Sequence, residues 1–138
     1  MRKMGYKVQS ILVDEHIDGS SASRAAEALR VSLRLGESGI VIGEVRGEEA
    51  KVLYESMHTG RAGSSIMGTI HGDSARTVYD RVVHDMGISP DAFAATDVIV
   101  TMGTFRDRST GADRRRISEI AATIGRDGSF ADIDPENP

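Results

Sequence analysis

The sequence predicts an α/β protein in which a largely parallel sheet is flanked by helices. Short apolar runs alternate with amphipathic segments of helical length, and this alternation is typical of strand–helix–strand units. The run at residues 40–42 is apolar throughout, as expected for a parallel strand that is buried on both faces. The 138 residues fit one domain, which we assign to residues 1–133. Residues 134–138 contain two prolines and no apolar residue, so we expect a disordered tail there.

The N-terminal elements are predicted to be a strand at residues 8–13 and a helix at residues 22–35. Ser20 or Ser21 can cap this helix, because a hydroxyl group accepts a hydrogen bond from an amide of the first turn. The helix is amphipathic, with apolar residues at helical spacing. This stripe consists of Ala22, Ala26, Leu29 and Leu33.

Two further helices follow the strand at residues 40–42. The first begins at Glu48 and Glu49, whose carboxylates suit the positive end of a helix dipole. Residues 65–70 then form a predicted strand that ends at His71. Ser74 caps the second helix, and its apolar stripe runs along Ala75, Val78, Val82 and Met86 before Gly87 ends it.

The C-terminal region is predicted to contain a short helical turn, a buried strand and a β-hairpin. Ser89-Pro90 opens the helical turn, because proline suits the first helical position. Residues 97–102 form the strand, and Ser109-Thr110-Gly111 suggests the turn of the hairpin. The three isoleucines that follow have helical spacing, but the turn before them favours a strand. They are Ile117, Ile120 and Ile124.

Composition excludes several classes of protein. The net charge is −4 and the isoelectric point about 5.5, unlike the basic balance of a dedicated nucleic-acid binder. There is no cysteine, which excludes disulfides and thiolate metal sites. No apolar run approaches the roughly 20 residues that cross a bilayer, so a cytoplasmic protein is expected. Aromatic residues make up only 4% of the chain, which predicts an aliphatic core.

The first candidate site is the segment Gly43-Glu44-Val45-Arg46-Gly47, directly after the strand at residues 40–42. A carboxylate at this place is suited to polarising a water molecule or to holding one on Mg²⁺ during hydrolysis of a nucleoside triphosphate. The flanking glycines would let the backbone approach a phosphate. The alternative is that Glu44 pairs only with Arg46 or caps a neighbouring helix.

The second candidate site is Gly68-Thr69-Ile70-His71-Gly72-Asp73-Ser74, again between a strand and a helix. His71 is suited to hydrogen-bonding a γ-phosphate. The alternative is a histidine that only caps the strand or the helix. Since ligands of α/β sheets bind at the carboxyl ends of strands, we expect Glu44 and His71 to lie side by side.

A third arrangement competes with these two. Ile11-Leu12-Val13-Asp14-Glu15 resembles the strand that binds Mg²⁺ in many ATPases and helicases, but a polar loop follows it. A helicase is therefore the weaker hypothesis, and the acidic balance also argues against it. The basic run at residues 114–116 has no interleaved aromatic residue, so we interpret it as a charged hairpin arm.

Two stretches of the chain together resemble one family. The first is Leu29-Arg30-Val31-Ser32-Leu33-Arg34, followed by Ile40-Val41-Ile42-Gly43-Glu44-Val45-Arg46-Gly47-Glu48-Glu49-Ala50. The second is Met57-His58-Thr59-Gly60-Arg61-Ala62-Gly63-Ser64, followed by Gly68-Thr69-Ile70-His71-Gly72-Asp73-Ser74-Ala75. They resemble the atypical Walker B box and the His box of the type II/type IV secretion ATPase superfamily. The residues in these two motifs are most similar to those of archaeal members.

The resemblance implies part of a RecA-like P-loop NTPase fold that works as a homo-hexamer with ATP and Mg²⁺. It implies that Glu44 activates the attacking water and holds Mg²⁺ through water, and that His71 lies near the γ-phosphate. It implies nucleotide contacts by Gly43, Arg46, Gly47 and Thr69, and inter-subunit contacts by Arg30 or Arg34. The implied partner is the inner-membrane platform protein of a secretion or pilus machine. The implied location is the inner face of the cytoplasmic membrane, reached only through partners.

The chain departs from the family pattern in two ways. It contains no G-x-x-x-x-G-K-[ST] loop, and the acidic box expected near Asp14 and Glu15 cannot be placed. Our main hypothesis is therefore a C-terminal catalytic fragment of a motor ATPase, inactive alone because the phosphate-binding loop is missing. The alternative hypothesis is an ATPase-like docking module of a secretion complex that does not hydrolyse ATP.

Overall fold

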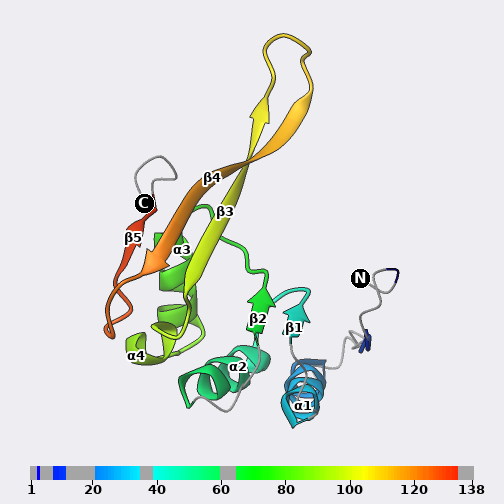
Figure 1. Ribbon diagram of the computed structural model, residues 1–138, viewed down its shortest axis with the longest axis vertical. Helices are drawn as coiled ribbons and strands as arrows, with labels where there is room; N and C mark the ends of the chain where they lie inside the picture. The colour runs from blue at the N-terminus through cyan, green and yellow to red at the C-terminus, as the bar shows by residue number, and fades with distance from the viewer. Residues whose placement is uncertain (1–2, 4–7, 12–20, 35–38, 60–64, 134–138) are drawn as a thin grey trace.

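The computed structural model describes residues 3, 8–11, 21–34, 39–59 and 65–133, which form a mixed α/β structure (Figure 1). This confirms that the chain combines helices and strands, as the predicted α/β class requires. The elements in chain order are α1 (Ser21–Arg34), β1 (Gly39–Ile42), α2 (Glu48–His58), β2 (Ser65–Gly68), α3 (Ala75–Asp80), the π-helical turn η2 (Arg81–Asp85), α4 (Pro90–Phe93), β3 (Val98–Arg106), β4 (Asp113–Thr123) and β5 (Phe130–Asp132).

The strands form two separate sheets. β1 and β2 pair in parallel, with Ile40 opposite Ile66 and Ile42 opposite Gly68. β3, β4 and β5 form an antiparallel sheet in that order. The prediction of a largely parallel sheet is therefore wrong for the described residues. The physical reason is the tight turn between β3 and β4, since strands joined by so short a connection can only run antiparallel.

One core cluster lies between β1–β2 and the helices α1 and α2. Its buried residues are Ala26, Leu29, Ile40, Val45, Ala50, Val52 and Leu53. Leu33 packs against this cluster, as its place in the predicted stripe requires. The opposite face of the two strands is bare, because Val41 is 70% exposed and Met67 is 69% exposed. The prediction that β1 is buried on both faces is thus wrong, since helices cover only one side of it among the described residues.

The second core cluster joins α2 to the C-terminal sheet. Phe93 and Val82 are its largest fully buried side chains. Tyr54 of α2 stacks on Phe93, with ring centroids 6.1 Å apart, and Tyr79 meets Phe93 edge-on at 5.0 Å. The prediction of an aliphatic core is therefore incomplete, because three aromatic rings pack together at the centre of this cluster.

Several boundaries differ from the predictions. Residues 8–11 have no strand, and β2 ends at Gly68, before Ile70. The helix after Ser74 continues beyond Asp80 as a π-helical turn, and Gly87 follows it with a φ of 71°. The predicted hairpin is confirmed, and β3 is longer than expected and antiparallel. Residues outside the described part include those proposed for the acidic box, Arg61 and the tail, namely 12–20, 60–64 and 134–138.

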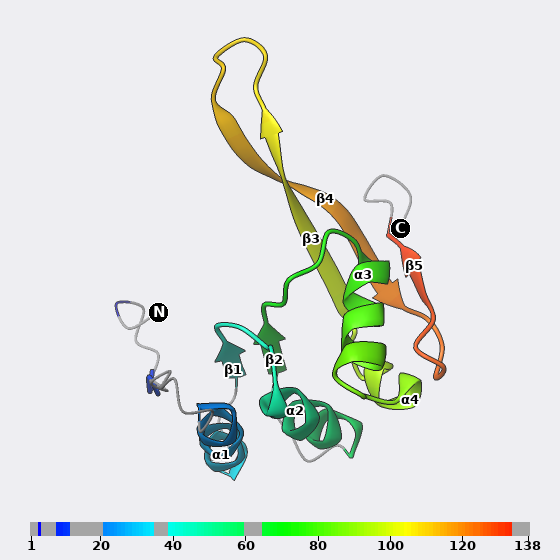
Figure 2. The same cartoon turned by 180° about the vertical axis from the view of Figure 1, so that it is seen from behind.

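The figures show how these elements are arranged. β1 and β2 lie side by side, and the hairpin of β3 and β4 extends well beyond the helices (Figures 1 and 2). No helix among the described residues is both long and apolar enough to cross a membrane.

Candidate functional site

The structure brings Glu44 and His71 together. Glu44 follows β1 and His71 follows β2, and the parallel register of Ile42 with Gly68 places both segments at the same edge of the sheet. Glu44 Oε1 lies 3.4 Å from His71 Nε2. Two residues separated along the sequence by a whole helix thus form one polar site at the carboxyl ends of neighbouring strands, where ligands of α/β sheets bind.

Backbone hydrogen bonds fasten the two segments to each other. The amide of Val45 donates to the carbonyl oxygen of Thr69 at 2.8 Å, and the amide of Thr69 donates to Ile42 at 3.3 Å. The Thr69 hydroxyl group donates to the carbonyl oxygen of Gly43. The contact is close at Gly68, where a β-carbon would lie 3.3 Å from Val45 Cγ2. The relative position of Glu44 and His71 is therefore set by main-chain contacts as well as by their own side chains.

The Glu44 carboxylate lies between two basic groups. Arg46 Nη2 approaches Glu44 Oε2 at 3.0 Å, while the other oxygen faces His71. The Glu44 side chain is 31% exposed and that of His71 is 80% exposed, so water can reach both. The pairing with Arg46 that the sequence left open as an alternative is present, but it occupies only one of the two carboxylate oxygens.

The first turn of α2 has its own carboxylate. Glu49 Oε1 accepts hydrogen bonds from the amide of Arg46 at 2.7 Å and from the amide of Gly47 at 2.9 Å. Glu49 is only 8% exposed. The two amides that the glycine-flanked segment offered to a phosphate thus have a partner within the chain. Sequence reasoning missed this role, although a glutamate in the first turn that reaches back to preceding amides is a known capping pattern.

Two side chains hold the start of α3, the helix that follows His71. Ser74 Oγ accepts from the amide of Thr77 at 3.1 Å, as predicted for a cap. Glu119 Oε2, on β4, accepts from the amide of Ala75 at 2.6 Å. The buried Thr101 hydroxyl group lies 3.5 Å from the same oxygen. No local sequence signal reveals Glu119, because 44 positions separate it from Ala75.

We expect Glu119→Ala to destabilise the chain by about 1–2 kcal/mol, the usual cost of losing a helix cap. Hydrogen exchange at the amides of residues 72–77 should become faster, because the amide of Ala75 loses its acceptor. Urea denaturation followed by circular dichroism, together with hydrogen exchange, measures both effects. Glu55→Ala is the matched control, since Glu55 is exposed on α2. Equal stability of the two variants would contradict the assigned role.

The arginine candidates Arg30 and Arg34 lie apart from this constellation, on α1. Both are exposed. Neither guanidinium group has an ion-pair partner among the described residues. Arg46 is the arginine that contacts Glu44 directly.

Comparison with known proteins gives concordant matches. A family model described as type II/IV secretion system protein matches residues 5–116. Two Mycobacterium tuberculosis proteins, provisionally named conjugal transfer proteins, are 29% identical over 121 residues, which cover 82% of this chain and 32% of each relative. An uncharacterized protein of Methanocaldococcus jannaschii is 39% identical over 56 residues, or 41% of this chain and 20% of the relative. The chain thus spans well under half the length of the curated relatives it matches.

Proposed function

Because the chain belongs to the type II/IV secretion system protein family, whose members are generally ATPases, we propose that it is the C-terminal catalytic part of an ATP-hydrolysing motor. The motor would power protein secretion or the assembly of a type IV pilus or archaellum. In this proposal the fold is part of a RecA-like domain. The observation that carries the proposal is the contact of Glu44 with His71 at 3.4 Å, at the carboxyl ends of two parallel strands.

The roles of the two residues follow from their chemistry. Glu44 is the acceptor for a proton of the attacking water, and it is held in place by Arg46 on its other oxygen. His71 donates a hydrogen bond toward the γ-phosphate and turns the Glu44 carboxylate toward the same point. Thr69 acts indirectly, because its hydroxyl group and its amide fasten the His71 segment to the Glu44 segment.

The described residues suit a Mg²⁺ ion that is contacted through water molecules and not directly by a protein side chain. No group of three or more histidine, cysteine, aspartate or glutamate side chains in the described part of the chain is arranged to hold a metal. Glu44 offers a partly exposed carboxylate at the site. Mg²⁺ usually keeps several waters and binds through one or two carboxylates and the substrate phosphates, so a single carboxylate acting through water suits it. When bound, the ion would neutralise charge on the phosphates.

Two observations support the view that the site is completed by residues outside this chain. The amides of Arg46 and Gly47 are bonded to Glu49, so they do not replace the missing phosphate-binding loop. Each sheet also exposes apolar side chains, with Val41 and Met67 in the parallel sheet and Val100 and Met102 in the antiparallel sheet all at least half exposed. Fully burying a side chain of this kind is favourable by about 1.5–3 kcal/mol, so these surfaces suit contact with further protein.

The remaining parts of the proposal concern assembly. We place Arg30 and Arg34 at a contact between subunits of a homo-hexamer, because both are exposed on α1. The motor would work on the cytoplasmic side of the inner membrane and reach it through a platform protein. Gly43 and Gly47, which have no side chains, would let a phosphate come close to the backbone, but their amides alone would not bind it.

A docking module without hydrolysis is the second candidate. The observation that favours it is that Arg46 and Glu49 already bond the groups a nucleotide would need. Phosphate release separates the two functions. We expect no ATP binding and no ATP-dependent phosphate release from the 138-residue chain alone, and clear turnover from a longer gene product that supplies a G-x-x-x-x-G-K-[ST] loop. A longer product that binds ATP without hydrolysing it would establish the docking module instead.

A further inference from the structure

The hairpin of β3 and β4 carries a projecting segment, residues 102–118, which we call the hairpin arm. β5 pairs with β4 only at residues 121–123, so the arm beyond it is two-stranded (Figure 2). None of its side chains is buried. A two-stranded hairpin alone is marginally stable in water, so an ordered arm of this length suggests a binding role more than a contribution to the core.

Asp107 orders the tip of the arm. Its Oδ1 accepts from the Ser109 hydroxyl group at 2.6 Å and from the amides of Ser109 and Thr110 at 2.9 and 3.3 Å. These bonds, the Ser109 hydroxyl group first among them, hold the pKa of Asp107 below its usual range. Gly111 follows with a φ of 68°, which completes the turn. The tip is therefore preformed, which lowers the entropy cost of binding.

The arm is basic although the chain is acidic. Residues 106–116 contain five arginines and two aspartates, whereas the whole chain has a net charge of −4. Arg114 Nε pairs with Asp107 Oδ2 at 3.3 Å. The other four have no ion pair among the described residues, and all four are exposed. They are Arg106, Arg108, Arg115 and Arg116.

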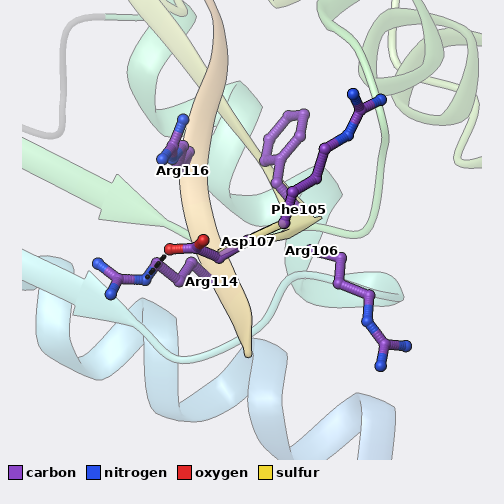
Figure 3. A pocket seen from close by; sticks show the side chains of 6 residues that line it. Phe105, Arg106, Asp107, Arg114 and Arg116 are labelled. Carbon is purple, nitrogen blue, oxygen red and sulfur yellow. Dashed lines mark ion pairs between the residues drawn. The ribbon is translucent and has the colours of Figure 1, made fainter. Parts of the chain in front are cut away.

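Each of the two faces of the arm carries both arginine and apolar side chains. Phe105 lies opposite Arg114, and Met102 lies opposite Ile117, so each pair projects from one face. A hollow of about 340 Å³ is lined by Phe105, Arg106, Asp107, Arg108, Arg114 and Arg116. Figure 3 shows Arg114 paired with Asp107, while the side chains of Arg106 and Arg116 extend in different directions.

We propose that the hairpin arm is the docking site for a carboxylate-rich segment of a partner protein. The planar guanidinium group binds carboxylates through paired hydrogen bonds, and four such groups on the arm are unpaired in the described chain. Aromatic, methionine and arginine side chains are enriched at protein interfaces, and the arm exposes Phe105 at 47% and Met102 at 61% beside its arginines. This inference is independent of ATP hydrolysis.

The same observations favour protein over nucleic acid. A surface that binds single-stranded nucleic acid stacks several bases on aromatic rings, and the arm has only Phe105. The rest of the chain is acidic, so a long polyanion that extends beyond the arm would meet more repulsion than a short peptide confined to it.

A labelled peptide of alternating glutamate and threonine tests the proposal on the 138-residue chain. We expect fluorescence anisotropy to show binding that weakens as salt rises, because exposed charges are screened. Arg108→Ala with Arg116→Ala should weaken it by about tenfold, since two exposed ion pairs with the peptide are lost and each contributes only modestly. Arg24→Ala with Arg126→Ala removes the same charge from other exposed sites and should leave affinity unchanged.

Three results would overturn the proposal. They are absence of peptide binding at low salt, equal loss in the arm variant and its control, and tighter binding of random single- or double-stranded DNA than of the peptide at the same salt. The last result would assign the arm to nucleic acid. Arg115→Glu provides a second arm variant, and circular dichroism establishes that each variant is folded. The same peptide with glutamine in place of glutamate should not bind.

Discussion

Replacing Glu44 with glutamine is expected to lower ATP turnover of the complete motor by about a hundredfold to ten-thousandfold, the usual contribution of a general base. Glutamine keeps the shape of the side chain and can still accept a hydrogen bond from Arg46, but it cannot take a proton from water. Nucleotide affinity should change little, because the phosphate-binding loop supplies most of it. Phosphate release and binding of a fluorescent ATP analogue measure the two quantities separately.

Glu48→Gln is the matched control for this variant. Glu48 lies in the first turn of α2, its side chain is 64% exposed, and its partner is Lys51 at 3.5 Å. The Glu48→Gln substitution removes the same charge near the same site and leaves the contacts of His71 and Arg46 intact. Turnover should therefore stay within about twofold of the wild type. Turnover retained by Glu44→Gln at the level of this control would remove Glu44 from the chemistry. The motor would then use another proton acceptor, because retained turnover is incompatible with a docking module that does not hydrolyse ATP.

The parts of this site that sequence could predict are those encoded locally. A continuous apolar run followed by Gly43-Glu44 indicates a strand end, and the same pattern recurs before His71. Their proximity then follows from the geometry of parallel strands, which place their carboxyl ends at one edge. The cap at Ser74 was equally local, since a serine contacts an amide only a few residues away.

The predictions that were wrong concern contacts between residues far apart in the sequence. Val41 and Val100 are apolar residues within apolar runs, which is why the sequence predicts burial on both faces for the first strand and a buried strand for the second. Whether other elements cover the second face of these strands depends on segments elsewhere in the chain, and the residues of the strand itself do not reveal it. Glu119 is similar, because nothing near it in the sequence points to the start of α3. The direction of β3 also could not be inferred from its apolar run alone.

Phe93→Ala is expected to produce the largest loss of stability, about 3–5 kcal/mol. Phe93 is fully buried, and it contacts rings that come from two other helices, Tyr54 of α2 and Tyr79 of α3. The alanine leaves a cavity between these rings and removes their aromatic contact. Since a domain is typically stable by only about 5–15 kcal/mol, a large part of the variant should be unfolded on mild heating. Urea denaturation followed by circular dichroism measures the change.

Phe105→Ala makes the comparison decisive, because it removes the same side chain from the hairpin arm, where the ring is 47% exposed. We expect a loss of less than about 1 kcal/mol there, since surface substitutions usually change stability little. Phe93→Leu should fall between the two, at about 1 kcal/mol, because it preserves most of the buried volume. Similar losses at Phe93 and Phe105 would mean that the aromatic cluster does not join α2 to the C-terminal sheet. The arm would then belong to the folded core instead of standing free for a partner.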